Sequence, residues 1–227
     1  MSEHADPEWF PPLEQALREP SGLLAAGGDL SPARLLSAYE RGVFPWYSAQ
    51  QPILWWSPDP RMVLFPEEFN CSHSLSKTIR KAALSTRVDH AFAETIRGCA
   101  APRLSGPDTW LNQEMISSYE QLHALGFAHS VETYFEEQLV GGLYGIQLGR
   151  VFFGESMYSR QRDASKVALA RLVAECRRRD IRLIDCQVAS GHLASLGARE
   201  VSRAQFVALL RKHAQRVPRG RWQDQDP

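Results

Sequence analysis

The stretch from Leu139 to Gln187 decides the fold: it reads LVGGLYGIQLGRVFFGESMYSRQRDASKVALARLVAECRRRDIRLIDCQ. Two apolar runs meet at a Gly-Arg pair, and a third run ends the stretch. Between them the apolar residues from Val167 to Cys176 keep the three-and-four spacing that is typical of a helix. The stretch therefore predicts a strand, a tight turn, a strand, a polar loop, a helix and a further strand.

Polar side chains stand inside two of these predicted strands. In the strand from Arg150 to Tyr158, alternation places Glu155 on the same face as large apolar residues. In the strand from Arg182 to Val188, Asp185 and Gln187 share one face. A carboxylate in an apolar strand is costly to bury unless it is hydrogen-bonded or faces a cavity with a polar occupant. These residues either have hydrogen-bond partners within the protein and a structural role, or form the polar part of a binding or catalytic site.

The composition is that of an ordinary globular protein. The chain has 227 residues, of which 44% are hydrophobic and 23% charged, and its 26 Lys and Arg balance 26 Asp and Glu. A neutral chain has no global field that would attract nucleic acid, so such binding needs a local patch. The four cysteines form no C-x-x-C pair, and no apolar run resembles a signal peptide or membrane span. We expect free thiols, no structural zinc and a cytoplasmic protein.

The N-terminal part predicts a small domain over residues 1–62, followed by a catalytic domain over residues 63–227. Ser31 is placed to cap a helix that stops at Gly42. Two aromatic runs follow, FPWY from residue 44 and ILWW from residue 53. Such runs usually form the core of a small domain, but for Trp46 stacking on a nucleic-acid base is a rival reading.

A basic helix is predicted from Ser72 to Ala83. Lys77, Arg80 and Lys81 are three and four residues apart, so they lie on one side of it. A charge run is usually a solvated surface. Because no acidic residue occurs from position 71 to 88, contact with phosphates is an alternative.

The other elements complete a mixed sheet flanked by helices, with a loose lead-in over residues 1–12. The expected pieces are helices over residues 89–99 and 112–126, strands over 129–134 and 139–146, a closing helix capped by Ser202, and a frayed tail from Arg216. This order is α+β and is similar to the topology of Gcn5-related N-acetyltransferases.

Two other chemistries fit the sequence poorly. Coenzyme A binding in such a fold calls for glycines that cradle a pyrophosphate, and the loop SRQRDASK has none. The run GESMY from residue 154 is a near miss for the serine-hydrolase motif G-x-S-x-G, because Tyr158 stands at the fifth position.

Longer blocks resemble one known family, the bacterial leucyl/phenylalanyl-tRNA protein transferases. They are spread from Ala16 to Ala198 and occur in the family's order: ALREPSGLLAAGGDLSPARLLSAYERGVFPW, ILWWSPDPR, DTW, AHSVE, LVGGLYG, FFGESMYS, ASK, LIDCQ and HLASLGA. The resemblance implies transfer of Leu or Phe, and less readily Met, from aminoacyl-tRNA to the N-terminal Arg or Lys of an acceptor protein. The acceptor is thereby marked for degradation. The resemblance also implies a small N-terminal domain joined to a Gcn5-like domain, with neither coenzyme A nor a metal.

The resemblance also implies roles for individual residues. Trp46 and Trp110 match contacts to the 3′ adenosine of the tRNA, and Lys77, Arg80 and Lys81 match a basic tRNA-binding helix. The proposed catalytic network is matched by Glu155, Asp185 and Gln187. The apolar pocket for the donor side chain is matched by Leu143, Phe152, Leu169, Leu172 and Ile184. The chain departs from the family at Leu172 and Cys176, where the resemblance implies bulkier, often aromatic, residues, so the preference between Leu and Phe stays open.

The mechanism is open at two points. Asp185, oriented by Gln187, either takes a proton from the acceptor's α-amine or acts as an electrostatic anchor. Glu155 either shapes the pocket or pairs with the acceptor's cationic side chain. Two other functions remain as alternatives: an acyl-CoA-dependent N-acyltransferase and a non-catalytic tRNA-binding module.

Overall fold

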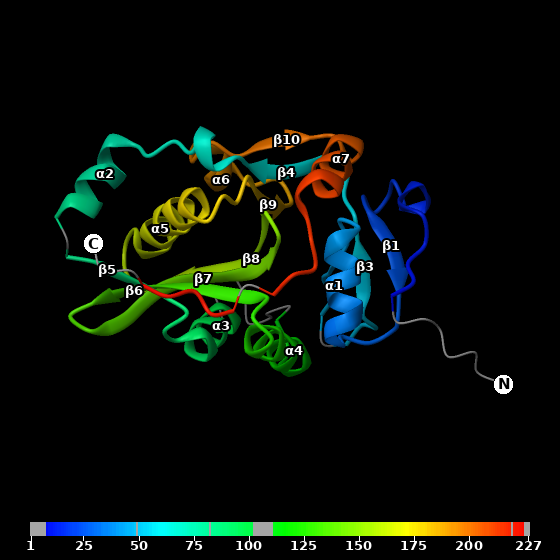
Figure 1. The fold of residues 1–227 in the computed structure, drawn as a ribbon, viewed down its shortest axis with the longest axis horizontal. Coiled ribbons are helices and arrows are strands. Elements are labelled where there is room, and N and C mark those ends of the chain that lie inside the picture. Colours follow the sequence, from blue (N-terminus) through cyan, green and yellow to red (C-terminus); the bar gives the residue numbers. More distant parts are fainter. Residues whose placement is uncertain (1–7, 49, 82, 102–110, 219, 225–227) are drawn as a thin grey trace.

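The computed structural model describes residues 8–48, 50–81, 83–101, 111–218 and 220–224 (Figure 1). Its helices are α1 Pro32–Glu40, α2 His73–Arg80, α3 Phe92–Ala100, α4 Gln113–Ala124, α5 Ala164–Arg178, α6 Gly191–Ser195 and α7 Arg203–His213. Its strands are β1 Leu23–Ala26, β2 Phe44–Pro45, β3 Leu54–Trp56, β4 Arg61–Leu64, β5 Ser85–Val88, β6 Ala128–Phe135, β7 Gln138–Leu148, β8 Val151–Ser159, β9 Leu183–Gln187 and β10 Arg199–Val201.

A seven-stranded mixed sheet forms the centre of the molecule. Its strand order is β10-β4-β9-β8-β7-β6-β5, and β8–β9 is its parallel pair while the other neighbours are antiparallel. The parallel pair needs a crossover, which α5 provides. The strands, tight turn, loop and helix predicted for residues 139–187 are all present.

Helices cover both faces of the sheet, α5 on one and α3 with α4 on the other (Figure 1). Alternation along β8 divides the two cores: Phe152 packs in the cluster that contains residues of α5, and Phe153 packs in the cluster that contains α4. The α+β class with helices flanking a mixed sheet is as expected. In the described part of the chain, no helix is long and apolar enough to cross a membrane.

A three-stranded sheet in the order β1-β3-β2 lies beside α1. Ser31 caps α1 as predicted by accepting a hydrogen bond from the Arg34 amide. The Tyr39 hydroxyl of α1 lies 2.7 Å from the Tyr119 hydroxyl of α4. This contact joins the N-terminal part to the core beneath the large sheet.

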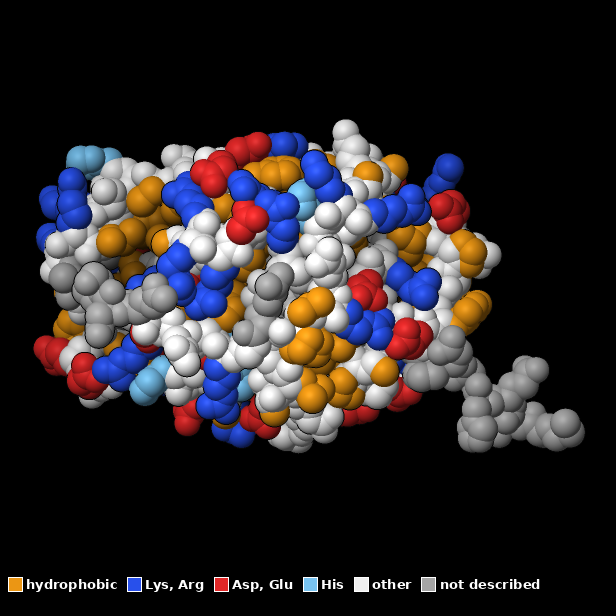
Figure 2. Space-filling view, in the orientation of Figure 1, with side chains coloured by type: hydrophobic (Ala, Val, Ile, Leu, Met, Phe, Trp, Pro, Cys, Tyr) orange, Lys and Arg blue, Asp and Glu red, His pale blue; other side chains and the backbone are white. Residues whose placement is uncertain are grey.

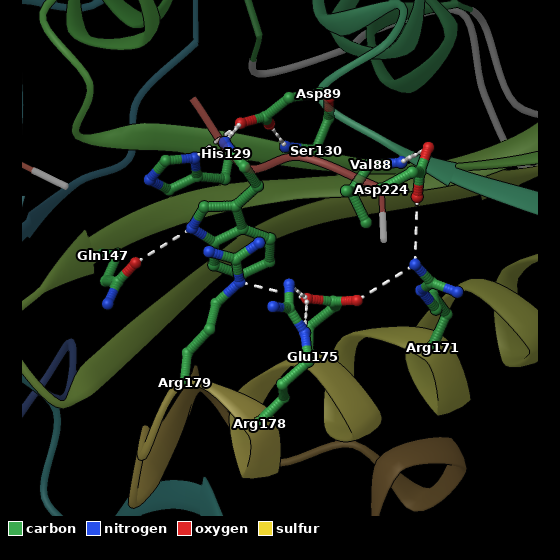
Figure 3. A network of polar contacts seen from close by, with 11 residues as sticks. Val88, Asp89, His129, Ser130, Gln147, Arg171, Glu175, Arg178, Arg179 and Asp224 are labelled. Atoms are coloured by element: carbon green, nitrogen blue, oxygen red, sulfur yellow. Dashed lines mark hydrogen bonds and ion pairs between the residues drawn. The ribbon is translucent and has the colours of Figure 1, made fainter. Parts of the chain in front are cut away.

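The C-terminal segment after α7 lies along the large sheet. The Trp222 side chain is buried, donates through Nε1 to Gln147 Oε1 at 3.0 Å, and stacks on His129 at a centroid distance of 4.5 Å. Asp224 pairs with Arg171 of α5 (Figure 3). For the described residues of this segment, the prediction of a frayed tail from Arg216 is therefore wrong, because polar and aromatic contacts hold them although they form no helix or strand.

Other differences concern short elements. The helix predicted from Ser72 to Ala83 ends at Arg80, and the chain forms β5 soon after it. Strands β1 and β5 were not predicted, because neither shows an apolar alternation. Both are fixed by pairing, β1 with β3 and β5 with β6.

Candidate active site

A cleft of about 320 Å³ opens where β8 and β9 separate. Their parallel pairing runs from Val151↔Leu183 to Phe153↔Asp185 and then stops, although β8 continues to Ser159. A register shift between Tyr144 and Gly145 of the neighbouring strand marks a bulge in β8 at this point. Beyond Phe153 and Asp185 the two strands are no longer paired with each other, and the side chains that follow line the cleft between them.

Glu155 and Gln187 meet across this cleft. The Gln187 side chain donates through Nε2 to Glu155 Oε1 at 2.7 Å. Its backbone N–H donates to Asp185 Oδ1 at 2.9 Å, and its φ of 64° lies in the left-handed region. The Gln187 side chain thus orients Glu155. The sequence had led us to expect that Gln187 would orient Asp185, which it contacts through its backbone N–H. All three residues line the cleft.

The Asp185 side chain is fully buried and paired with Arg61, which the sequence reasoning did not single out. Arg61 Nε donates to Oδ1 at 2.8 Å and Nη2 donates to Oδ2 at 2.6 Å. Both carboxylate oxygens are thereby engaged in a two-bond ion pair. The residues are 124 positions apart in the chain, so no local pattern could have indicated the pair.

Burial raises the pKa of Glu155 to about 7. The Tyr119 hydroxyl, which donates to Glu155 Oε2 at 2.8 Å, acts against this rise, whereas the nearby Asp185 charge adds to it. Tyr119 in turn meets the Tyr39 hydroxyl. A carboxyl group that titrates near neutral pH is suited to giving and taking protons.

The apolar half of the cleft holds four of the five residues predicted for the donor pocket: Leu143, Leu169, Leu172 and Ile184. Phe152 does not line the cleft. It is fully buried behind it, with its ring 5.7 Å from that of Trp222. Met157, which was not predicted, lines the cleft because it lies on β8 opposite Leu143.

Trp46 lies at the edge of the cleft with 44% of its surface exposed. Trp56 supports it, because its ring lies 5.9 Å away and its Nε1 donates to the Trp46 carbonyl at 2.6 Å. Trp110, the other predicted adenosine contact, lies outside the described residues.

A second hollow of about 240 Å³ adjoins the cleft and shares Phe44, Trp46 and Val188 with it. Trp56 forms another part of its wall, and its charged lining consists of Asp59 and Glu200. No Lys or Arg is among the described residues that line it.

The three predicted basic residues lie on or beside α2 and are exposed: Lys77, Arg80 and Lys81. Figure 2 shows Lys and Arg side chains over much of this face of the molecule, with Asp and Glu side chains among them. Three arginines of α5 and its end share Glu175 as their partner: Arg171, Arg178 and Arg179. Within the described chain, the three cations of α2 have no acidic partner.

The described part of the chain contains no group of three or more His, Cys, Asp or Glu residues that could hold a metal ion.

Comparisons with known proteins give one consistent result. A family model described as Leucyl/phenylalanyl-tRNA protein transferase matches residues 63–211, and a model of the N-terminal domain of that family matches residues 28–59. The chain is 58% identical to the Leucyl/phenylalanyl-tRNA--protein transferase of Nitrosomonas europaea over 201 residues, which is 88% of this chain and 85% of that one. It is 56% identical to the enzyme of the same name from Aromatoleum aromaticum over 214 residues, 94% of this chain and 90% of that one.

Solved structures offer only remote likenesses. A GCN5-related N-acetyltransferase from Kribbella flavida has a TM-score of 0.41 and 12% identity, covering 75% of this chain and 61% of that one. The structure of L-PGS from Bacillus licheniformis has a TM-score of 0.41 and 11% identity, covering 68% of this chain and 50% of that one. Neither says anything about the chemistry of this cleft.

Proposed function

The chain belongs to the leucyl/phenylalanyl-tRNA protein transferase family, and from this premise we propose how its cleft transfers an aminoacyl group from tRNA to a protein. The donors are Leu, Phe and, less readily, Met. The acceptor is the N-terminal Arg or Lys of a protein that is thereby marked for degradation, and the tRNA substrate implies action in the cytoplasm. One observation carries the proposal: an apolar pocket adjoins the hydrogen-bonded group of Glu155, Gln187 and Asp185.

The donor side chain occupies the apolar half of the cleft. Its walls are formed by Leu143, Met157, Leu169, Leu172 and Ile184, which present no charge. An apolar pocket of this kind separates side chains that differ by one methylene by only about 1–3 kcal/mol. A donor set of Leu, Phe and Met is therefore reasonable.

The tRNA lies along the exposed edge of the cleft. Trp46 offers an aromatic face for the 3′ adenosine next to the ester bond, and base stacking on such a face contributes about 1–3 kcal/mol. The exposed cations of α2 contact phosphates farther from the ester.

The acceptor's α-amine attacks the ester carbonyl beside Gln187. Because Gln187 Nε2 donates to Glu155, the Gln187 carbonyl oxygen is the end of the amide that can accept a hydrogen bond from the amine. Asp185 serves as the anchor rather than the base, since Arg61 engages both of its oxygens.

Proton transfer completes the reaction. As the new C–N bond forms and the ester C–O bond breaks, the amine loses a proton and the departing ribose oxygen gains one. Glu155 holds this proton in transit, because its pKa of about 7 matches the working pH.

The second hollow suits the cationic side chain of the acceptor. Its aromatic wall at Trp46 and Trp56 can face a cation, and Asp59 with Glu200 can pair with one. The same carboxylates repel RNA phosphates, which favours the acceptor over the tRNA as the occupant of this hollow.

The test is to incubate the protein with radiolabelled leucyl-tRNA and two model proteins that differ only in beginning with Arg or Ala. Label is expected on the Arg protein alone, and equal labelling of both or of neither would contradict the proposal. In a variant with Asp59→Asn and Glu200→Gln, the KM for the Arg protein is expected to rise by about 10-fold, as for loss of hydrogen bonds to a charged group. The KM for leucyl-tRNA should be unchanged.

A further inference from the structure

Arg61 lies at the centre of a buried set of contacts next to the cleft. Its side chain is fully buried, and besides the two bonds to Asp185 its Nη1 donates to the Gly42 carbonyl at 3.2 Å. The rings of Phe44 and Phe206 lie 4.7 Å and 4.6 Å from the guanidinium carbon. The guanidinium group thus donates hydrogen bonds from all three of its nitrogens and packs against two aromatic rings.

This arrangement fixes a geometry more than it adds stability. A buried ion pair is expensive to desolvate, and apolar residues of the same size often stabilise a core as well or better. What a planar guanidinium supplies is direction, because two parallel N–H donors hold a carboxylate in one orientation. Asp185 can therefore present its Oδ1 atom to one further donor at a defined position.

That further donor is the backbone N–H of Gln187, at 2.9 Å. The φ of Gln187 is 64°, a backbone conformation that costs about 1–3 kcal/mol for a residue other than glycine. A register shift between Met62 and Val63 leaves Cys186 without a partner in β4 next to this turn. The bond to Asp185 thus stabilises the turn that directs the Gln187 side chain toward Glu155.

We propose that Arg61 is a positioning residue for the transfer reaction: it acts only through Asp185, holds the Gln187 turn, and so places Gln187 and Glu155 beside the reacting ester. This inference rests on the proposed function. Arg61 itself does not line the cleft. Its effect is on the rate of the chemical step and not on substrate binding.

The test is Arg61→Lys, which keeps the charge and loses the two parallel bonds. Single-turnover transfer from leucyl-tRNA to an Arg-starting protein is expected to slow by at least 10-fold at saturating substrate, with KM for leucyl-tRNA within twofold of the parent value. In an Asp185→Asn background the same substitution should change the rate by less than twofold, because its route of action is already broken. Arg216→Lys is the matched control: Arg216 pairs with Glu8 and Glu40 away from the cleft, so the rate should not change.

Three results would overturn the inference: a folded Arg61→Lys protein with the parent rate, a change confined to KM, or an equal loss of rate in the Asp185→Asn background. If Arg61→Lys does not fold, Phe206→Leu replaces it, since it removes one flanking ring and leaves the ion pair. It should slow transfer at least twofold with the same unchanged KM, and an unchanged rate would again overturn the inference. Absence of transfer by the parent protein would instead refute the proposed function.

Discussion

At the scale of single residues, Glu155 shows how opposing effects set a protonation state. Burial penalises its charged form, whereas the hydroxyl of Tyr119 and the amide of Gln187 donate to its two oxygens. The result is a pKa of about 7 in place of 4.5. A carboxyl group with this pKa can exchange protons at neutral pH, and its place in the cleft makes Glu155 a candidate for that role.

Replacement Glu155→Gln should change how stability depends on pH. The folded pKa of about 7 exceeds the ordinary 4.5, so between these values the folded protein holds a proton that the unfolded chain has lost. The parent protein therefore loses stability as pH rises through this window, by up to about 3 kcal/mol. Urea unfolding at pH 5 and pH 8 should show the variant gaining relative to the parent at the higher pH.

The control is Glu132→Gln, whose pKa is likewise raised to about 7 by burial but whose side chain accepts from the His90 and Ala91 amides. Both variants should show the stability effect. In the proposed mechanism the parent's transfer rate rises through pH 7 as Glu155 loses its proton, and only Glu155→Gln should remove this rise. If both variants keep the parent's rate profile, Glu155 does not carry the proton.

Leu172 should influence the choice between Leu and Phe donors. It is buried and lines the apolar half of the cleft, so Leu172→Phe fills space that the donor side chain needs. In a competition between leucyl-tRNA and phenylalanyl-tRNA, the Phe-to-Leu product ratio is expected to fall by about 10-fold. Leu172→Ala should raise the ratio. If neither substitution changes the ratio, the donor side chain does not bind next to Leu172.

The residues of the candidate site were predicted unevenly. Alternation within one strand was enough to indicate Glu155 and Asp185, because the face of a side chain depends on local geometry. Arg61 could not be found this way, since it belongs to β4 and pairs with β9 far along the chain. The same holds for Tyr119, whose hydroxyl reaches Glu155 from a helix.

At the scale of elements, the split between β8 and β9 creates the cleft. Pairing ends at Asp185, and the bulge in β8 directs Glu155 toward Gln187 of the other strand. The sequence predicted these strands and the capped helices, because caps and periodicity are local signals. It could not predict that β4 lies beside β9, which depends on packing of the whole sheet.

Helix α2 should act on tRNA affinity alone. Replacing Lys77, Arg80 and Lys81 with Ala removes three exposed cations that contact phosphates in the proposed complex. We expect the KM for leucyl-tRNA to rise by about 10-fold or more, with kcat unchanged. The slope of log KM for leucyl-tRNA against log salt concentration should become shallower by about 2. Arg97→Ala on α3, an exposed arginine paired with Glu120, is the control that should change neither. A lower kcat would contradict this prediction, because it would show that these residues affect the transfer step and not only tRNA binding.

At the scale of the whole molecule, ion pairs join parts of the chain that are far apart in sequence. Arg216 pairs with Glu8 and with Glu40 of α1, so the segment after α7 is tied to the N-terminal part before it turns along the sheet. We propose a division into domains at residue 62, which lies within β4. Because Arg61 and Arg216 both reach across this boundary, the two parts should unfold together.

The C-terminal segment should be essential to stability. Trp222 is buried against His129 and Phe152, and its backbone N–H donates to Asp89 at 2.6 Å. Trp222→Ala leaves a cavity and an unpaired Gln147 oxygen, so we expect the free energy of unfolding in urea to fall by about 3–5 kcal/mol. Val217→Ala, in the same segment but largely exposed, should cost less than about 0.5 kcal/mol. Equal, small losses for both variants would show that the segment is a loose tail, as its sequence alone indicates.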